Sequence, residues 1–95
     1  MYIIRDKEQN PILRIEDSDL FAANLNHKDL RGADFRGQKM TYVCLSGALL
    51  DGADFRGADL RCAYMGDTTL DGAIIDETTI LPKKSEPEYH RPCWM

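Results

Sequence analysis

The sequence lacks the long apolar runs and the residue clusters by which membrane and metal-binding proteins are commonly recognised. Its 95 residues contain no segment close to the ~20 apolar residues that a membrane-spanning helix needs. The apolar start, residues 1–4, is too short for a secretory signal. Three cysteines are present without any CxxC pair, so the ligand spacing of a zinc site is missing. We expect one cytoplasmic domain without a metal or cofactor.

Catalytic motifs are missing as well. The sequence has no P-loop, HExxH motif or dinucleotide-binding fingerprint. Of its two histidines, His27 falls in an expected turn and His90 in the C-terminal tail, so neither is placed to complete a catalytic triad. Aspartates are numerous, but in turns they commonly hydrogen-bond to nearby backbone. We therefore expect a protein that is not an enzyme, with no catalytic residue.

Cations are outnumbered, and they are unevenly placed. Twelve Lys and Arg face sixteen Asp and Glu, a net charge of -4, which argues against direct binding of nucleic acid. Within residues 16–80 every Lys and Arg precedes Cys62, and the next cation is Lys83. Four acids lie between these two positions, and we predict that they form a partner surface. They are Asp67, Asp71, Asp76 and Glu77.

What the sequence does contain is a period of five residues. From Leu20 onward, every fifth residue is large and apolar at thirteen consecutive positions, which we expect to face a common interior. These inward residues are Leu20, Leu25, Leu30, Phe35, Met40, Leu45, Leu50, Phe55, Leu60, Met65, Leu70, Ile75 and Ile80. The position two residues earlier is mostly small, with seven alanines. Six of the seven glycines lie two residues after a large apolar residue.

A period of five fits neither a helix nor a flat strand. On a helix, steps of five would spread the apolar residues over every face, and on a strand they would alternate between the two faces. The pattern is consistent if the chain bends once per repeat. Glycine permits such a bend because it tolerates positive φ, and neighbouring Asp or Asn can hydrogen-bond to the turn backbone.

Three segments, residues 33–37, 53–57 and 58–61, resemble the A(D/N)LXX motif of pentapeptide repeat proteins. The resemblance implies an all-β fold, a right-handed quadrilateral parallel β-helix with one repeat per side and four per coil. Thirteen repeats then make a little over three coils, a rod about 16 Å long at the strand spacing of ~4.8 Å. Residues twenty apart should stack, as in the column Phe35, Phe55 and Ile75.

The predicted organisation has three parts. Residues 1–15 are expected to form an N-terminal cap, either a hairpin or an extended segment, and residues 16–81 the β-helix. Residues 82–95, with three prolines, are expected to be an irregular tail. Two alternatives stay open for the last coil. Either Tyr89 and Trp94 of the tail cover it, or it remains an exposed apolar edge that favours self-association.

Three functions follow from these patterns. The first is a non-catalytic protein-binding or scaffold module with an unknown protein partner and no contact with membranes or nucleic acid. The second comes from the resemblance alone, because some pentapeptide repeat proteins imitate DNA and act on DNA gyrase or topoisomerase. The third is an end-stacking subunit, either an end-to-end homodimer or a piece that stacks on another pentapeptide protein.

Overall fold

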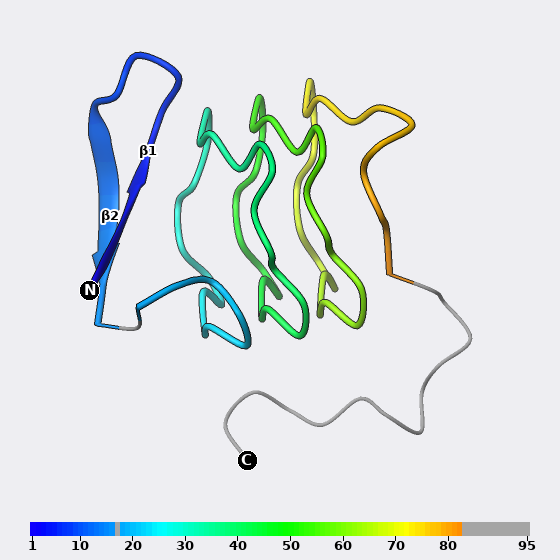
Figure 1. Ribbon diagram of the computed structural model, residues 1–95, viewed down its shortest axis with the longest axis horizontal. Coiled ribbons are helices and arrows are strands. Elements are labelled where there is room, and N and C mark those ends of the chain that lie inside the picture. Colours follow the sequence, from blue (N-terminus) through cyan, green and yellow to red (C-terminus); the bar gives the residue numbers. More distant parts are fainter. Residues whose placement is uncertain (17, 83–95) are drawn as a thin grey trace.

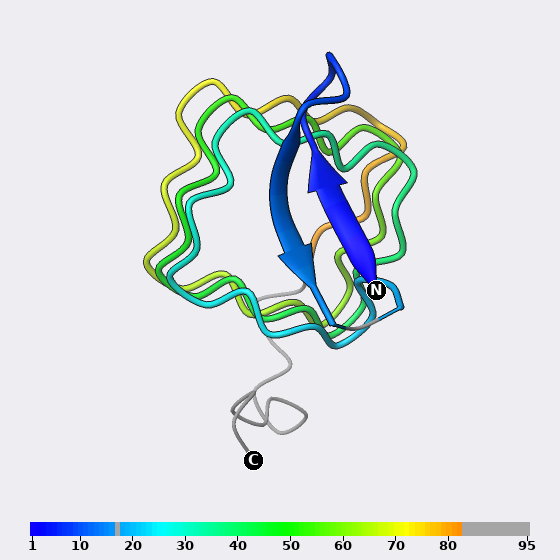
Figure 2. The same ribbon diagram turned by 90° about the vertical axis from the view of Figure 1, so that its left-hand side faces the viewer.

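A two-stranded hairpin forms the N-terminal end of the molecule. The computed structural model describes residues 1–16 and 18–82. Strand β1 (Tyr2–Arg5) pairs in antiparallel fashion with strand β2 (Pro11–Ile15), the two strands of one sheet. The hairpin crosses the opening of the first coil (Figure 2). It buries Ile4, which is 1% exposed, against the interior of the coils.

The hairpin is joined to the coils by backbone contacts. The N–H of Asp34 donates to the carbonyl oxygen of Arg5 at 2.8 Å, and Asp6 forms an antiparallel bridge with Ala33. These contacts occupy part of the edge that the first coil would otherwise leave unpaired. The N-terminal end of the rod is therefore covered, which reduces its tendency to pair with another strand.

The remainder of the chain winds into four-sided coils of twenty residues that stack side by side (Figures 1 and 2). Seven parallel bridges join residues that are twenty positions apart. They link Asn24 to Cys44, Asp29 to Leu49, Asp34 to Asp54, Lys39 to Asp59, Cys44 to Tyr64, Leu49 to Thr69 and Asp54 to Ile74. The backbone of each coil thus hydrogen-bonds to the backbone of the next coil. Other repeat architectures are likewise stabilised by contacts between nearest neighbours.

The corners of the coils have left-handed backbone. Every fifth residue from Ala22 to Gly72 has φ between +57° and +75°. Six of these residues are glycines, as the sequence pattern predicted. The other five are Ala22, His27, Tyr42, Cys62 and Asp67, and the pattern did not indicate that non-glycine residues adopt the same conformation. The corner is therefore imposed by the coil, and glycine lowers its cost where it is present.

The core is filled by the large apolar residues of the first nine repeats. All nine are 0% or 1% exposed. They are Leu20, Leu25, Leu30, Phe35, Met40, Leu45, Leu50, Phe55 and Leu60. The rings of Phe35 and Phe55 stack with their centroids 5.2 Å apart and their planes 14° from parallel. The predicted column is confirmed for these two residues.

The predicted interior is not buried beyond Leu60, and this corrects the sequence analysis. Met65 is half-buried, Leu70 is 44% exposed and Ile75 is 53% exposed. An inward residue is buried by the coils stacked on both sides of it. Among the described residues no coil follows the last one, residues 62–82. The residues of tail 82–95 beyond Pro82, with Tyr89 and Trp94, lie outside the described residues.

Ile80 requires a different correction, because it does not occupy an inward position. On this side of the coil the parallel bridge joins Asp59 to Ile80, which are 21 residues apart. The preceding turn, at 77–78, also comes one residue later than the period predicts. One additional residue has therefore been inserted, so Ile80 stacks on Asp59 and Leu81 takes the place equivalent to Leu60. The shift could not be recognised in the sequence, because Ile80 and Leu81 are both large and apolar.

Candidate functional site: the side walls and the last coil

Four aspartates on the side walls each pair with the arginine two residues later. In every pair Nε and Nη2 of the arginine reach the carboxylate oxygens at 2.6–3.2 Å. The pairs are Asp29–Arg31, Asp34–Arg36, Asp54–Arg56 and Asp59–Arg61. Arg36 also approaches an aspartate of the next coil, because its Nε lies 4.0 Å from Oδ2 of Asp54.

These four aspartates also shape the corners. The carboxylate of each accepts a hydrogen bond from the backbone N–H of its arginine partner at 3.1–3.3 Å. Hydrogen bonds from the arginine side chains are the main reason that the pKa of each aspartate lies below its ordinary value. Because these carboxylates are held as turn-forming anions, they are poorly suited to act as a general acid or base.

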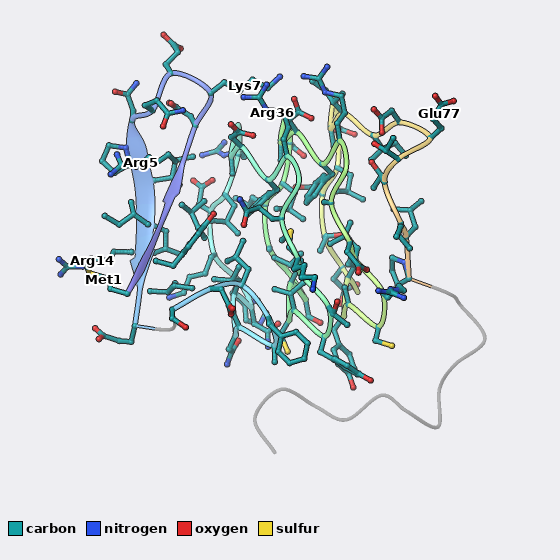
Figure 3. All side chains as sticks on the ribbon, in the orientation of Figure 1. Met1, Arg5, Lys7, Arg14, Arg36 and Glu77 are labelled. Atoms are coloured by element: carbon teal, nitrogen blue, oxygen red, sulfur yellow. The ribbon has the colours of Figure 1, made fainter. Side chains whose placement is uncertain are left out.

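Asp54 differs from the other three because its side chain is fully buried, at 0% exposed. In addition to Arg56, its carboxylate is 2.9 Å from Nζ of Lys7, which reaches over from the hairpin (Figure 3). The Arg56 guanidinium, followed by Lys7, holds the pKa of Asp54 far below its ordinary value, although burial acts in the opposite direction. This contact ties the N-terminal cap to the second coil. Sequence reasoning missed it, since nothing in the repeat relates residue 7 to residue 54.

The last coil carries an apolar hollow of about 210 Å³. Its lining is almost entirely apolar, and most of its members are the inward residues left uncovered by a further coil. The hollow is lined by Phe55, Leu60, Met65, Leu70, Ala73, Ile75 and Leu81. Leu81 lines it and Ile80 does not, as the inserted residue requires. An open apolar surface of this kind is characteristic of an interaction site.

The four predicted partner residues lie on this same coil, at three of its corners. Asp67, Asp71 and the pair Asp76 and Glu77 are all exposed, and Glu77 projects away from the body of the rod (Figure 3). The Asp76 carboxylate accepts hydrogen bonds from Thr78, which lower its pKa. We call these four residues the acidic corners. They remain a predicted partner surface, and they lie on the same coil as most residues that line the hollow.

The last coil also presents backbone groups without a coil to pair with. In the coil before it, the N–H groups of Leu45, Leu50 and Phe55 donate to the next coil at 2.7–2.9 Å. Among residues 1–16 and 18–82, no backbone oxygen accepts from the equivalent groups of Met65 and Leu70. A buried N–H without a partner costs free energy, so a molecule that covers this end would need to supply acceptors or leave water there.

The described residues offer no metal site and no membrane segment. No group of three or more His, Cys, Asp or Glu side chains lies close enough to hold a metal ion within this part of the chain. Nor does any helix in it have the length and apolarity to cross a bilayer. His27 occupies a left-handed corner, and its imidazole lies over Gly47, where an added Cβ would approach Nδ1 to 2.4 Å. His90 lies outside the described residues.

Comparison with known proteins accounts for the period and the coils. The family model named "Pentapeptide repeats" matches residues 18–57 and 45–76, with eight copies. The chain belongs to the pentapeptide repeat family. Its fold is therefore the right-handed quadrilateral β-helix, as the sequence resemblance predicted. The family by itself indicates no particular activity, partner or process.

One solved structure of a pentapeptide repeat protein resembles this chain. It is the crystal structure of Rfr23 from the cyanobacterium Cyanothece 51142, with a TM-score of 0.57 and 32% sequence identity. The similarity covers 61% of this chain and 43% of the other, so this chain spans less than half the length of that protein. No curated protein gives a significant match to the sequence.

Proposed function

We propose that this pentapeptide repeat protein is a non-catalytic protein-binding module of the cytoplasm that binds its partner at the last coil. The apolar hollow, on the coil that also bears the acidic corners, carries this proposal. It combines uncovered apolar surface, which provides affinity, with charges of one sign, which select a partner. On the side walls, by contrast, four aspartates are already paired with arginines.

We infer the kind of partner from the chemistry of the last coil. It should insert one or two large apolar or aromatic side chains into the hollow, since such anchors supply most of the affinity of many interfaces. Lys or Arg residues should flank these anchors and face Asp67, Asp71, Asp76 and Glu77. Charges of this exposed kind act mainly on the association rate and on specificity, so the affinity should weaken as salt rises.

Two other functions are less well supported. An enzyme needs a nucleophile, acid or base held beside a substrate cavity, and the aspartates of the walls are instead engaged in arginine pairs and turns. Imitation of DNA needs a continuous negative face. Here Arg31, Arg36, Arg56 and Arg61 neutralise the wall aspartates one by one.

The test is affinity capture from a lysate of the source cells with matched variants. The hollow is disrupted by Leu70→Asp, and the acidic corners by the double change Asp71→Lys with Asp76→Lys. Ile80→Asp is the control for the first variant, because Ile80 is 46% exposed but does not line the hollow. Circular dichroism should show that each variant retains the coils.

We expect one partner to be retained by the unchanged protein and by Ile80→Asp, and to be lost severalfold by both disruptive variants. A second control, Glu8→Lys with Glu16→Lys, reverses two exposed acids in the N-terminal region and should leave capture unchanged. Equal capture by every variant would exclude the last coil as the binding site. Absence of any specific partner would contradict the proposed function as a whole.

A further inference from the structure

We propose that the partner binds the last coil as an extended segment, which adds one β-strand along the side formed by residues 68–72. This inference rests on the proposed function above and specifies the conformation of the partner. The strand would pair with the open backbone of this side, insert one apolar or aromatic side chain into the hollow, and direct Lys or Arg toward Asp67 and Asp71. These two acidic corners lie at the two ends of the side.

Three backbone groups of this side are open. They are the N–H groups of Leu70 and Gly72 and the carbonyl oxygen of Thr68, and within residues 1–16 and 18–82 nothing pairs with them. Twenty residues earlier, the same three groups all form hydrogen bonds to the next coil, at 2.9–3.2 Å. A strand laid along this side would complete the pattern, as extended peptides do when they add to an exposed sheet edge.

The opposite end of the rod shows how a coil of this chain is closed (Figure 1). There the hairpin supplies a backbone acceptor, because the carbonyl oxygen of Arg5 accepts from the N–H of Asp34 at 2.8 Å. It supplies an apolar side chain, Ile4, which enters the interior and is 1% exposed. It also supplies a cation, because Nζ of Lys7 lies 2.9 Å from Oδ2 of Asp54. An extended segment of the partner would bring the same three kinds of contact to the last coil.

The geometry of a sheet brings a side chain of such a strand into the hollow. Neighbouring strands lie about 4.8 Å apart, and the side chains of paired residues point to the same face. A partner residue that pairs beside Leu70 therefore points into the hollow, which Leu70 helps to line. A helical partner could fill the hollow but could not pair with the open edge, because the backbone groups of a helix are bonded internally. The open edge therefore favours a strand over a helix.

Charge restricts the occupant further. Between Cys62 and Pro82 the sequence holds four acids and no Lys or Arg, so a basic strand is attracted and an acidic one is repelled. The same balance opposes a second copy of the chain, because two last coils placed end to end would bring like charges together. A head-to-tail stack of coils is opposed as well, because the hairpin covers the first coil (Figure 2).

Amide hydrogen exchange, followed by nuclear magnetic resonance on the whole isotope-labelled chain, tests the proposal with a defined probe. The probe is a synthetic peptide of about ten residues, a common strand length, in which Lys alternates with Val around one central Phe. We expect it to slow the exchange of the Leu70 and Gly72 amides severalfold. The amides of Leu50 and Gly52 are the internal control, because they are already paired with the next coil and should not change.

Two altered peptides separate backbone pairing from side-chain contacts. The same peptide with N-methylated amides keeps every side chain but cannot pair along the edge, and it should bind severalfold more weakly. The same peptide with Glu in place of Lys should leave both amides unprotected. In the protein, Leu70→Asp should abolish binding of the basic peptide, whereas Ile80→Asp should not, because Ile80 is 46% exposed but does not line the hollow. If Leu70→Asp disturbs the coil by circular dichroism, the comparison of the peptides still decides.

The strand is overturned if the basic peptide protects neither amide, or if its N-methylated form binds equally well. Slow exchange of the Leu70 and Gly72 amides without any peptide would also overturn it. The edge would then be occupied by the same chain, or by a second copy if the protection is lost on dilution. The two proposals can fail separately. Protection by the peptide without any captured partner would keep the strand site and remove the proposed function, and a captured partner that protects neither amide would do the reverse.

Discussion

Two glycines in different positions of the corner allow a direct test of why the chain turns where it does. Gly32 has φ +75°, whereas Gly66 lies outside the left-handed region, and at neither would an added Cβ meet an atom within 4 Å. Replacing each with alanine therefore changes backbone freedom without creating a clash. The two substitutions isolate the conformational cost of the corner from its packing.

The expected effects have opposite signs. Alanine at Gly32 must adopt a left-handed conformation, which costs roughly 1–2 kcal/mol for a residue with a Cβ. Alanine at Gly66 meets no such cost, and it restricts the unfolded chain, which stabilises the fold by about 0.4–1 kcal/mol. For a chain of this size, 1 kcal/mol corresponds to a shift of about 4–8 °C in Tm.

Urea unfolding followed by circular dichroism measures both variants. Gly32→Ala should lower the midpoint and Gly66→Ala should leave it unchanged or raise it, with the same m-value, since neither changes the surface exposed on unfolding. The reverse substitution, Ala22→Gly, relieves a φ of +57° at the position equivalent to Gly32 and should raise the midpoint. Equal shifts for the two alanine variants would refute the argument that backbone conformation sets the corner.

Three further predictions concern the contacts that hold the rod together. Lys7→Met removes a charged hydrogen bond from buried Asp54 and should cost about 1.5–3 kcal/mol, while Lys28→Met at an exposed position should change stability by less than ~0.5 kcal/mol. Leu50→Ala, at a position that is 0% exposed, should cost about 2–5 kcal/mol in urea unfolding, and a smaller loss would mean that the core is loosely packed. Stability should be constant above about pH 5 and fall as the pH drops below the unfolded-state pKa near 3.9. Stability falls in acid because the four arginine-paired aspartates have lowered pKa values when folded. The unfolded chain therefore takes up more protons than the folded chain at low pH. Equal unfolding midpoints at pH 7 and pH 3 would contradict this prediction.

The sequence by itself determined the architecture, because the forces that define it act within each repeat. A large apolar residue, a small residue and a turn residue recur every five positions. Each repeat therefore favours the same local backbone conformation. The period therefore predicted the inward residues from Leu20 to Leu60 and the left-handed glycines. It also placed the acidic corners on one stretch of chain.

Only the tertiary structure decided the features that depend on distant or adjacent coils. The contact of Lys7 with Asp54 joins segments that share no pattern, so it appears only once the hairpin has folded over the coils. One inserted residue makes Leu81 the inward residue and leaves Ile80 bridged to Asp59. Both neighbours are apolar, so the sequence could not tell which one faces inward, and only the stacking on the coil of Leu60 decides it. Burial of an inward residue depends on the coil stacked next to it rather than on its own repeat. For this reason the same five-residue pattern gives a dry core at Leu50 and an open hollow at Leu70.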